Sequence, residues 1–322
     1  MKSFVVNKND AAQRLDKFVI KAAPSLPKAL MYKYIRIKRI KVNGKRAEIS
    51  TRLNVGDTVD MYINDEHFER PTPKYDFLSA PADVSIVYED GNILVANKKQ
   101  GLLCHPDKNE YNDTLIARIS HYLYNKGEYD PDNEASFSPA LCNRIDRNTC
   151  GMVIAAKNAV ALREMCDKIK SREITKKYLA VLHGEPRKKS GEIISFLQKD
   201  EEKNRVFLRS EGGENTKTAK LRYRIIKSEN GLSLAEIELL TGRTHQIRAQ
   251  MASIGCPLLG DGKYGKNAAD RKKGFTKQAL CSYYLRFDFD NGELAYLHGK
   301  ELKIENIWFV KELFPDLDIA TL

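Results

Sequence analysis

The 322-residue sequence contains no apolar run that approaches the roughly 20 residues of a membrane-spanning helix, so we expect no membrane partner. Its first residues show no long apolar core and no small-residue cleavage site, which predicts a cytoplasmic protein. No cysteine belongs to a C-x-x-C pair, and no histidine lies at the spacing of a zinc site. We therefore expect no metal site and reduced, mostly buried thiols at Cys104, Cys142, Cys150, Cys166, Cys256 and Cys281.

A phosphate-binding fingerprint is also absent. The segment "LLGDGKYG", residues 258–265, lacks the G-x-G-x-x-G spacing, and no strand–loop–helix unit fits around it. We interpret this segment as a turn. The sequence therefore predicts no nucleotide cofactor.

Positive charge is concentrated at the start of the chain. Residues 1–64 contain fourteen lysines and arginines and five acids, which leaves +9 of the formal net charge of +11. A solvated basic face is one interpretation of such a segment. Because a small segment of one charge repels itself unless a polyanion offsets that charge, we favour binding to nucleic acid.

The same segment has the periodicity of a compact domain, which we predict at residues 1–64. Residues 14–23 place apolar side chains at helical spacing, and residues 26–40 predict a second helix with Leu30, Tyr34 and Ile37 on one side. A hairpin around an Asn-Gly dipeptide and a further strand follow. The candidate RNA contacts in this domain are Arg14, Lys28, Lys38, Arg39 and Lys45.

A larger domain follows a linker. Residues 65–81 contain three prolines and little periodicity, which is typical of a linker. Residues 82–322 contain helical patterns near 114–126 and 158–170, and then closely spaced strands with short connections that favour antiparallel pairing. We predict an α+β domain with a mainly antiparallel mixed sheet flanked by helices.

A charged triplet interrupts two apolar strands in "ALCNRIDRNTCGMVIAAK", residues 140–157. Asp146 lies in the predicted turn, with Arg144 two residues before it and Arg147 directly after it. A buried carboxylate is costly unless it is paired, and a flanking arginine can keep it ionised through charge and bidentate hydrogen bonds. Spacing alone leaves two interpretations open, a structural ion pair and a catalytic carboxylate.

A second constellation lies in "LLTGRTHQIRAQMASIG", residues 239–255. Its helical pattern predicts a buried stripe of Ile247, Met251 and Ile254. Arg248 lies at the edge of this stripe, where a carboxylate from elsewhere could meet it. For His245 we favour a hydrogen bond at the helix start over a role as general base.

Tyr178 lies in the predicted strand "TKKYLAVLHG", residues 175–184, just after two lysines. A tyrosine in a strand usually belongs to the core, but it can also offer its ring face to a nucleic-acid base. The sequence alone leaves both interpretations open.

These motifs resemble those of two families. "NRIDRNTCGMVIAAK" is similar to the motif around the catalytic aspartate of the RluA-type pseudouridine synthases. "KKYLAVLHG", "GRTHQIR" and "GDGKYG" resemble the other motifs of that family in their order and spacing. Residues 12–63, with "QRLDKF", "VNGK" and "VGDTV", resemble the alpha-L RNA-binding domain of many RNA-modifying enzymes.

The resemblance implies isomerisation of uridine to pseudouridine in structured RNA, with no cofactor, because the reaction adds and removes no atoms. It implies that Asp146 is the catalytic aspartate, that Tyr178 stacks on a flipped-out base and that Arg248 pairs with Asp146. Arg144 and Arg243 would contact the RNA, and Arg147 stays unassigned. Large-subunit ribosomal RNA is the implied substrate and transfer RNA the alternative, and we expect a monomer. A non-catalytic RNA- or ribosome-binding factor with the same fold is the alternative function.

The sequence also departs from the family patterns. None of the departures removes the aspartate, the tyrosine or the second arginine, so they concern finer substrate contacts. The RluA-type pattern usually has His, Ser, Pro and His where this chain has, in turn, Asn143, Cys150, Lys99 and Cys281. The RNA-binding domain often has Ser-Arg where this chain has Pro27-Lys28.

Overall fold

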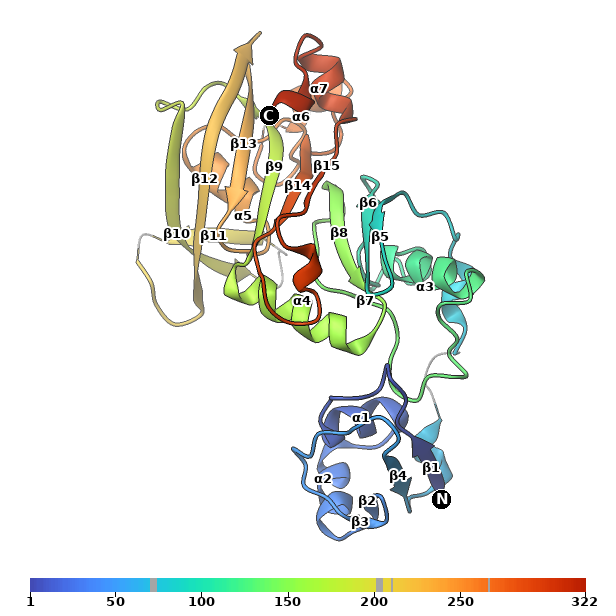
Figure 1. Ribbon diagram of the computed structural model, residues 1–322. Helices are drawn as coiled ribbons and strands as arrows, with labels where there is room; N and C mark the ends of the chain where they lie inside the picture. Colours follow the sequence, from blue (N-terminus) through green and yellow to red (C-terminus); the bar gives the residue numbers. More distant parts are fainter. Residues whose placement is uncertain (70–73, 201–204, 210, 266) are drawn as a thin grey trace.

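The computed structural model describes residues 1–69, 74–200, 205–209, 211–265 and 267–322. Figure 1 shows a small N-terminal unit next to a larger unit built on a long sheet. Residues 70–73 of the predicted linker lie outside the described residues. The rest of that linker contains two one-turn 3-10 helices, η1 (Asp65–Phe68) and η2 (Asp76–Ser79). No helix of the described part of the chain is long and apolar enough to cross a membrane.

The N-terminal unit packs two helices against a small antiparallel sheet with strand order β1-β4-β2-β3. Its apolar core includes the buried side chains of Phe18, Met31 and Ile35. The elements are β1 (Lys2–Val5), α1 (Leu15–Ala22), α2 (Lys28–Arg36), β2 (Ile40–Val42), β3 (Lys45–Arg46) and β4 (Thr58–Met61).

The second helix differs from its prediction in two ways. It ends at Arg36 instead of continuing to residue 40, and Lys38 follows it with a φ of +65°. Its buried side chains are Met31 and Ile35. Of the predicted apolar side, Leu30 and Tyr34 are partly buried against the core, but Ile37 follows the helix and is exposed. The helix carries apolar residues on more than one side, and its packing against α1 and β2 decides which side is covered.

The larger unit contains one sheet, in which the described residues form eleven strands. The main strand order is β11-β10-β12-β13-β9-β14-β8-β6-β5, with β7 paired to β8 and β15 paired to β14. Pairing is antiparallel except between β8 and β14. The strands are β5 (Ile86–Glu89), β6 (Ile93–Lys98), β7 (Ala140–Leu141), β8 (Cys150–Ala156), β9 (Ile174–His183), β10 (Ser190–Asp200), β11 (Arg205–Arg209), β12 (Thr216–Glu229), β13 (Leu232–Leu239), β14 (Leu280–Phe287) and β15 (Glu301–Lys303).

Helices cover both faces of this sheet, and the alternation of side chains along each strand sorts residues between two apolar cores. One core contains side chains of α4 (Ala159–Ser171) and α7 (Trp308–Leu313). The other contains side chains of α3 (Leu115–Asn125) and α5 (Gln246–Ser253). A shorter helix, α6 (Asn267–Lys272), and two 3-10 turns, η3 (Ala295–Leu297) and η4 (Ile319–Thr321), complete the described elements. The predicted α+β class with a mainly antiparallel mixed sheet is confirmed.

A buried carboxylate joins the two units. Asp10, which is fully buried, accepts hydrogen bonds from the backbone nitrogens of Ser136 at 2.8 Å and Phe137 at 2.9 Å. Arg163 on α4 donates to the carbonyl oxygen of Ala11 at 3.1 Å. The N-terminal unit is therefore attached to the larger one through polar contacts as well as through the chain.

Candidate active site

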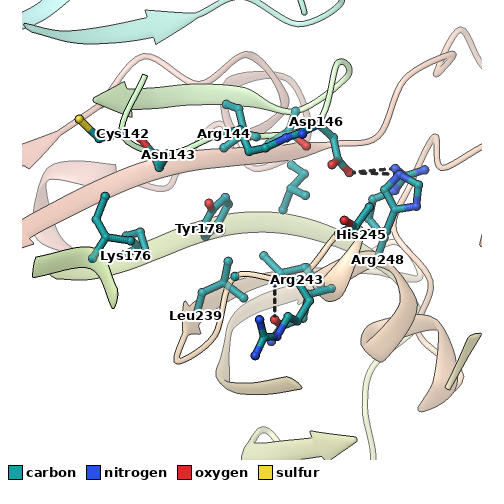
Figure 2. Close-up of a pocket in the computed structure, with 18 residues that line it drawn as sticks. Cys142, Asn143, Arg144, Asp146, Lys176, Tyr178, Leu239, Arg243, His245 and Arg248 are labelled. Carbon is teal, nitrogen blue, oxygen red and sulfur yellow. Dashed lines mark hydrogen bonds and ion pairs between the residues drawn. The ribbon is translucent and has the colours of Figure 1, made fainter. Parts of the chain in front are cut away.

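A cavity of about 290 Å³ opens on the face of the sheet that α5 covers. The turn between β7 and β8, strand β9 and the segment that leads into α5 line it, as Figure 2 shows. Five of the predicted site residues meet in this cavity: Arg144, Asp146, Tyr178, Arg243 and Arg248.

The turn that carries Asp146 is held by backbone contacts with residues 99–102. The buried ammonium of Lys98 donates to the carbonyl oxygen of Arg147 at 3.0 Å and to two carbonyls of that segment. Arg147 Nε donates to the carbonyl oxygen of Gly101 at 3.0 Å, and Gly101 N donates back at 2.8 Å. Burial lowers the pKa of Lys98 to about 8. Arg147 thus stabilises the turn and leaves the carboxylate of Asp146 to another partner.

A close approach between β8 and β14 explains the glycine that follows this turn. Gly151 has a φ of +113°, and a Cβ atom there would lie 2.3 Å from the carbonyl oxygen of Ser282. Only glycine fits this position. The adjacent cysteines, Cys150 and Cys281, are directly paired across the two strands, so two of the departures from the family pattern are neighbours.

Arg248 binds two carboxylates at once. Its Nη1 donates to Asp146 Oδ2 at 2.9 Å, although the two residues lie 102 positions apart in the sequence. Its Nε and Nη2 donate to the two carboxylate oxygens of Asp261 at 2.7 and 2.9 Å. A bidentate fork of this kind fixes the plane of the guanidinium group, so Asp261 orients Arg248 toward Asp146.

Burial and charge act in opposite directions at these groups. The side chain of Asp261 is 0% exposed, that of Arg248 is 8% exposed and that of Asp146 is 27% exposed. Burial alone would raise the pKa of Asp261, but the hydrogen bonds and the charge of Arg248 hold that pKa below its ordinary value. Asp261 lies in "GDGKYG", which we interpreted as a turn and as part of a family motif without a role for Asp261, so the sequence reasoning missed its contact with Arg248.

His245 lies beside Asp146 as a neutral group. Its Nε2 is 3.8 Å from Asp146 Oδ2, and its Nδ1 is 3.1 Å from the hydroxyl of Tyr264. Burial lowers the pKa of His245 to about 4, which keeps the imidazole uncharged at neutral pH. The predicted hydrogen bond of its side chain at the helix start is wrong, because His245 precedes α5 with a φ of +51° and its side chain makes no cap bond.

Tyr178 has features of both interpretations that the sequence left open. It is only 5% exposed and packs in the core beneath α5, yet it also lines the cavity. Burial raises the pKa of Tyr178 to about 12, so its phenol stays protonated at neutral pH. The strand alternation that places Leu179 and Val181 in the opposite core directs Tyr178 to the side of the cavity.

Two exposed arginines lie at the rim of the cavity. Arg144 is exposed and lines the cavity, and its side chain makes no ion pair with Asp146 among the described contacts. Arg243 is exposed and donates from Nε to the carbonyl oxygen of Thr218 at 3.1 Å. Neither flanking arginine of the charged triplet is therefore the ion-pair partner of Asp146.

The candidate RNA contacts of the N-terminal unit are exposed, and three of them also contact other side chains of this unit. Arg14 donates twice to Asp16, at 3.0 Å each time, while Lys28 lies over the ring of Tyr32. Arg39 lies over the ring of Tyr34, with its Cζ 5.6 Å from the ring centre. Lys38 lies in the turn after α2, and Lys45 lies on β3.

Two further departures from the family pattern have structural partners. Asn143 Oδ1 accepts a hydrogen bond from the backbone nitrogen of Ile154 at 2.8 Å, so this side chain ties β8 to the turn. Lys99 forms an exposed ion pair with Asp83 at 2.9 Å. Within the described residues, no cluster of three or more His, Cys, Asp or Glu side chains is arranged to hold a metal ion.

Comparison with known proteins points to one family. Residues 92–253 match the family described as RNA pseudouridylate synthase, and residues 13–59 match the S4 domain. A Rickettsia bellii protein named ribosomal large subunit pseudouridine synthase C is 33% identical over 307 residues, which cover 91% of this chain and 94% of the relative. A Borreliella burgdorferi protein named ribosomal large subunit pseudouridine synthase D is 30% identical over 257 residues, covering 79% and 77% of the two chains.

A solved structure, that of human RNA pseudouridylate synthase domain containing 1, resembles this fold with a TM-score of 0.55 at 23% identity, covering 76% of this chain and 89% of that chain. This likeness concerns the fold alone. Together the matches define the class of the protein, an RNA-modifying enzyme with an attached RNA-binding domain. The chain belongs to the RNA pseudouridylate synthase family, and it is a pseudouridine synthase with an N-terminal S4 domain. The resemblance to the RluA-type synthases is confirmed.

Proposed function

We propose that this enzyme converts uridine to pseudouridine in large-subunit ribosomal RNA, with Asp146 as the catalytic carboxylate. The substrate proposal comes from the relatives named ribosomal large subunit pseudouridine synthases C and D. The observation that carries the catalytic proposal is the contact at 2.9 Å between Arg248 and a partly exposed Asp146 in a cavity that also contains Tyr178.

The reaction needs an ionised carboxylate. The bond between N1 of the base and C1′ of the sugar breaks, the base turns, and C5 bonds to C1′ while C5 loses a proton and N1 gains one. Asp146 acts as nucleophile or base in this sequence, and Arg248 donates a hydrogen bond to its carboxylate. Attack on the sugar, attack on the ring and removal of a sugar proton are three routes open to the same carboxylate.

Base flipping brings the uridine to this site, because a base stacked in RNA is out of reach of a recessed carboxylate. The ring of Tyr178 supports the flipped base, and such stacking contributes roughly 1–3 kcal/mol. Arg144 and Arg243, at the rim of the cavity, bind the flanking backbone or the position that the base has left. Both arginines are exposed, which suits contact with phosphate.

Residues 1–64 form the RNA-binding domain in this proposal, residues 65–81 the linker and residues 82–322 the catalytic domain. Arg14, Lys28, Lys38, Arg39 and Lys45 contact phosphates, and Arg14 does so with the part of its guanidinium that Asp16 leaves open. Contacts with about five phosphates on single-stranded RNA would reduce affinity on the order of a hundredfold between about 50 and 200 mM salt.

Tritium release tests the catalytic proposal. Ribosomal RNA labelled with tritium at carbon-5 of uridine, isolated from a strain that lacks this protein, should lose tritium when the enzyme is added. Asp146→Asn should abolish release and leave RNA binding intact. Asp113→Asn is the matched control, because Asp113 also pairs with an arginine, Arg118, but lies outside the cavity.

Three results would contradict the proposal. Release by Asp146→Asn would exclude Asp146 as the catalytic group. Release from transfer RNA alone would show that transfer RNA, and not ribosomal RNA, is the substrate. If the wild type released no tritium from either RNA, the alternative function, a non-catalytic RNA-binding factor, would be supported.

A further inference from the structure

Tyr264 is a partly buried tyrosine that lies outside the apolar cores. It follows the "GDGK" turn, and no apolar core of the described residues includes it. Its ring instead contacts two cations, because the Cζ atoms of Arg205 and Arg248 lie 5.0 and 5.4 Å from its centre. The negative face of an aromatic ring attracts a guanidinium at this distance, so Tyr264 holds the arginine that reaches Asp146.

The hydroxyl of Tyr264 links two further parts of the molecule. It accepts a hydrogen bond from the backbone nitrogen of Val206 at 2.8 Å and lies 3.1 Å from Nδ1 of His245. Since His245 is neutral at pH 7, its Nδ1 can accept a hydrogen bond from the hydroxyl of Tyr264, and the N–H at Nε2 then faces Asp146. The hydroxyl thereby orders the imidazole next to the carboxylate.

The strand that Tyr264 binds lies at the edge of the sheet. β11 is the terminal strand in the sheet order, and its N–H at Val206 finds its acceptor in the phenol oxygen of Tyr264. Arg205, Phe207 and Arg209 are the exposed side chains of this strand, and Arg205 lies over Phe207 with a separation of 5.7 Å. A continuous row of cations and rings therefore leads from an exposed strand, through Tyr264, to Arg248 and the carboxylate.

We propose that Tyr264 is a positioning residue of the reaction, whose ring holds Arg248 against Asp146 and whose hydroxyl fastens β11 and His245 to the site. This inference rests on the proposed role of Asp146. Asp261 binds one edge of the Arg248 guanidinium and Asp146 another, while the ring of Tyr264 covers its face. With both edges bound and the face covered, the guanidinium is constrained against rotation, and the geometry of the reacting groups depends on such constraint.

Two substitutions separate the ring from the hydroxyl. Tyr264→Phe keeps the ring face and removes both hydroxyl contacts, whereas Tyr264→Leu removes the ring as well. Tyr223→Leu is the control for loss of a tyrosine ring elsewhere, since Tyr223 is a buried tyrosine of β12 whose hydroxyl donates to the backbone carbonyl of Lys188 at 3.2 Å. The full chain is used throughout, with the tritiated ribosomal RNA described above.

Single-turnover tritium release over a range of enzyme concentrations gives a limiting rate and a half-saturating concentration. We expect Tyr264→Leu to lower the limiting rate about tenfold and to change the half-saturating concentration less than about twofold. Tyr264→Phe should keep most of the limiting rate, because phenylalanine retains the aromatic ring that covers Arg248. A limiting rate within about twofold of the wild type for Tyr264→Leu would overturn the role of the ring, as would an equal loss in Tyr223→Leu.

Hydrogen exchange supplies a test that does not depend on activity. In Tyr264→Phe the amide of Val206 should exchange about tenfold faster than in the wild type, while amides of the central strands stay protected. Unchanged exchange at Val206 would overturn the role of the hydroxyl. This measurement still decides the matter if Tyr264→Leu does not fold. A wild type that releases no tritium would refute the proposed function, and the exchange of Val206 would then show whether Tyr264 holds β11.

Discussion

Replacing Arg248 by alanine removes one cation from between two carboxylates, and the burial of each carboxylate indicates which one contributes more to the loss of stability. Asp261 is fully buried and loses two hydrogen bonds, although it keeps those from the backbone nitrogens of Lys263 at 2.8 Å and Tyr264 at 3.2 Å. Breaking a buried ion pair in this way costs about 3–5 kcal/mol of folding stability. Because two backbone donors still bind Asp261, we expect a loss of about 3 kcal/mol. Asp146 is 27% exposed, so water solvates its charge. Its contribution to the loss of stability is therefore at most about 1 kcal/mol.

The size of this loss should depend on pH, and its sign follows from Asp261. In the wild type the folded-state pKa of Asp261 lies below the ordinary value of about 4, so the pair stabilises the fold above that pH and loses its effect as pH falls through the folded pKa. In Arg248→Ala the burial of Asp261 raises its pKa, and protonation then relieves the unpaired charge. The difference in the free energy of unfolding between the wild type and Arg248→Ala should therefore be largest near neutral pH and become smaller as pH falls toward about 4.

Urea unfolding followed by circular dichroism, near neutral pH and again near pH 4, measures this difference. Arg147→Ala is the control, because Arg147 is exposed and, among the described residues, its side chain donates to one backbone carbonyl, so it should cost less than about 1 kcal/mol. A loss below about 1 kcal/mol in Arg248→Ala near neutral pH, or a loss that does not change with pH, would refute the reasoning.

Two further predictions concern pH and salt. His245→Gln should leave the shape of the pH–rate profile unchanged between about pH 5.5 and 8, because a pKa of about 4 keeps His245 neutral there; a profile that loses an inflection in this range would show that His245 titrates in it. Removing residues 1–64 should weaken binding to ribosomal RNA and flatten its dependence on salt between about 50 and 200 mM, measured by filter binding. An unaltered slope would argue against the N-terminal unit as the main phosphate contact.

The contact between Asp261 and Arg248 also explains why a turn without a phosphate-binding pattern matters to the site. The carboxylate of Asp261 accepts from the backbone of its own turn and from the guanidinium of Arg248. Tyr264, three residues later, covers the same guanidinium. A short segment that looked like a simple turn therefore supplies two groups that orient Arg248.

Local patterns predicted the elements best where one periodicity dominates. The helical patterns near 114–126 and 158–170 correspond to α3 and α4, and the short connections between later strands correspond to antiparallel pairs. The predictions of buried side chains were wrong at helix ends, as at Ile37 after α2. Ile254 was expected in the buried stripe of α5 but follows the helix and is 37% exposed, because the helix ends at Ser253.

The sequence by itself determined the chemical groups of this protein and their family. The order of the motifs, the basic N-terminal segment and the alternation of strand residues are properties of the chain that need no knowledge of its path in space. The strand and helix patterns predicted an α+β fold, and the resemblance of the motifs to known families predicted an RNA-modifying enzyme of the RluA type. They also identified Asp146, Tyr178 and Arg248 as the residues to examine.

Only the tertiary structure decided which of these groups touch. Asp146 has two arginines within two residues of it, yet its carboxylate meets Arg248, which is 102 residues away, while Arg147 binds the backbone of Gly101 and Arg144 lies exposed at the rim. The buried partner of Arg248, Asp261, was not predicted at all. Contacts of this kind depend on how β8, β9 and β14 pair and on where α5 lies against them, and periodicity along the chain carries no information about such distant pairs.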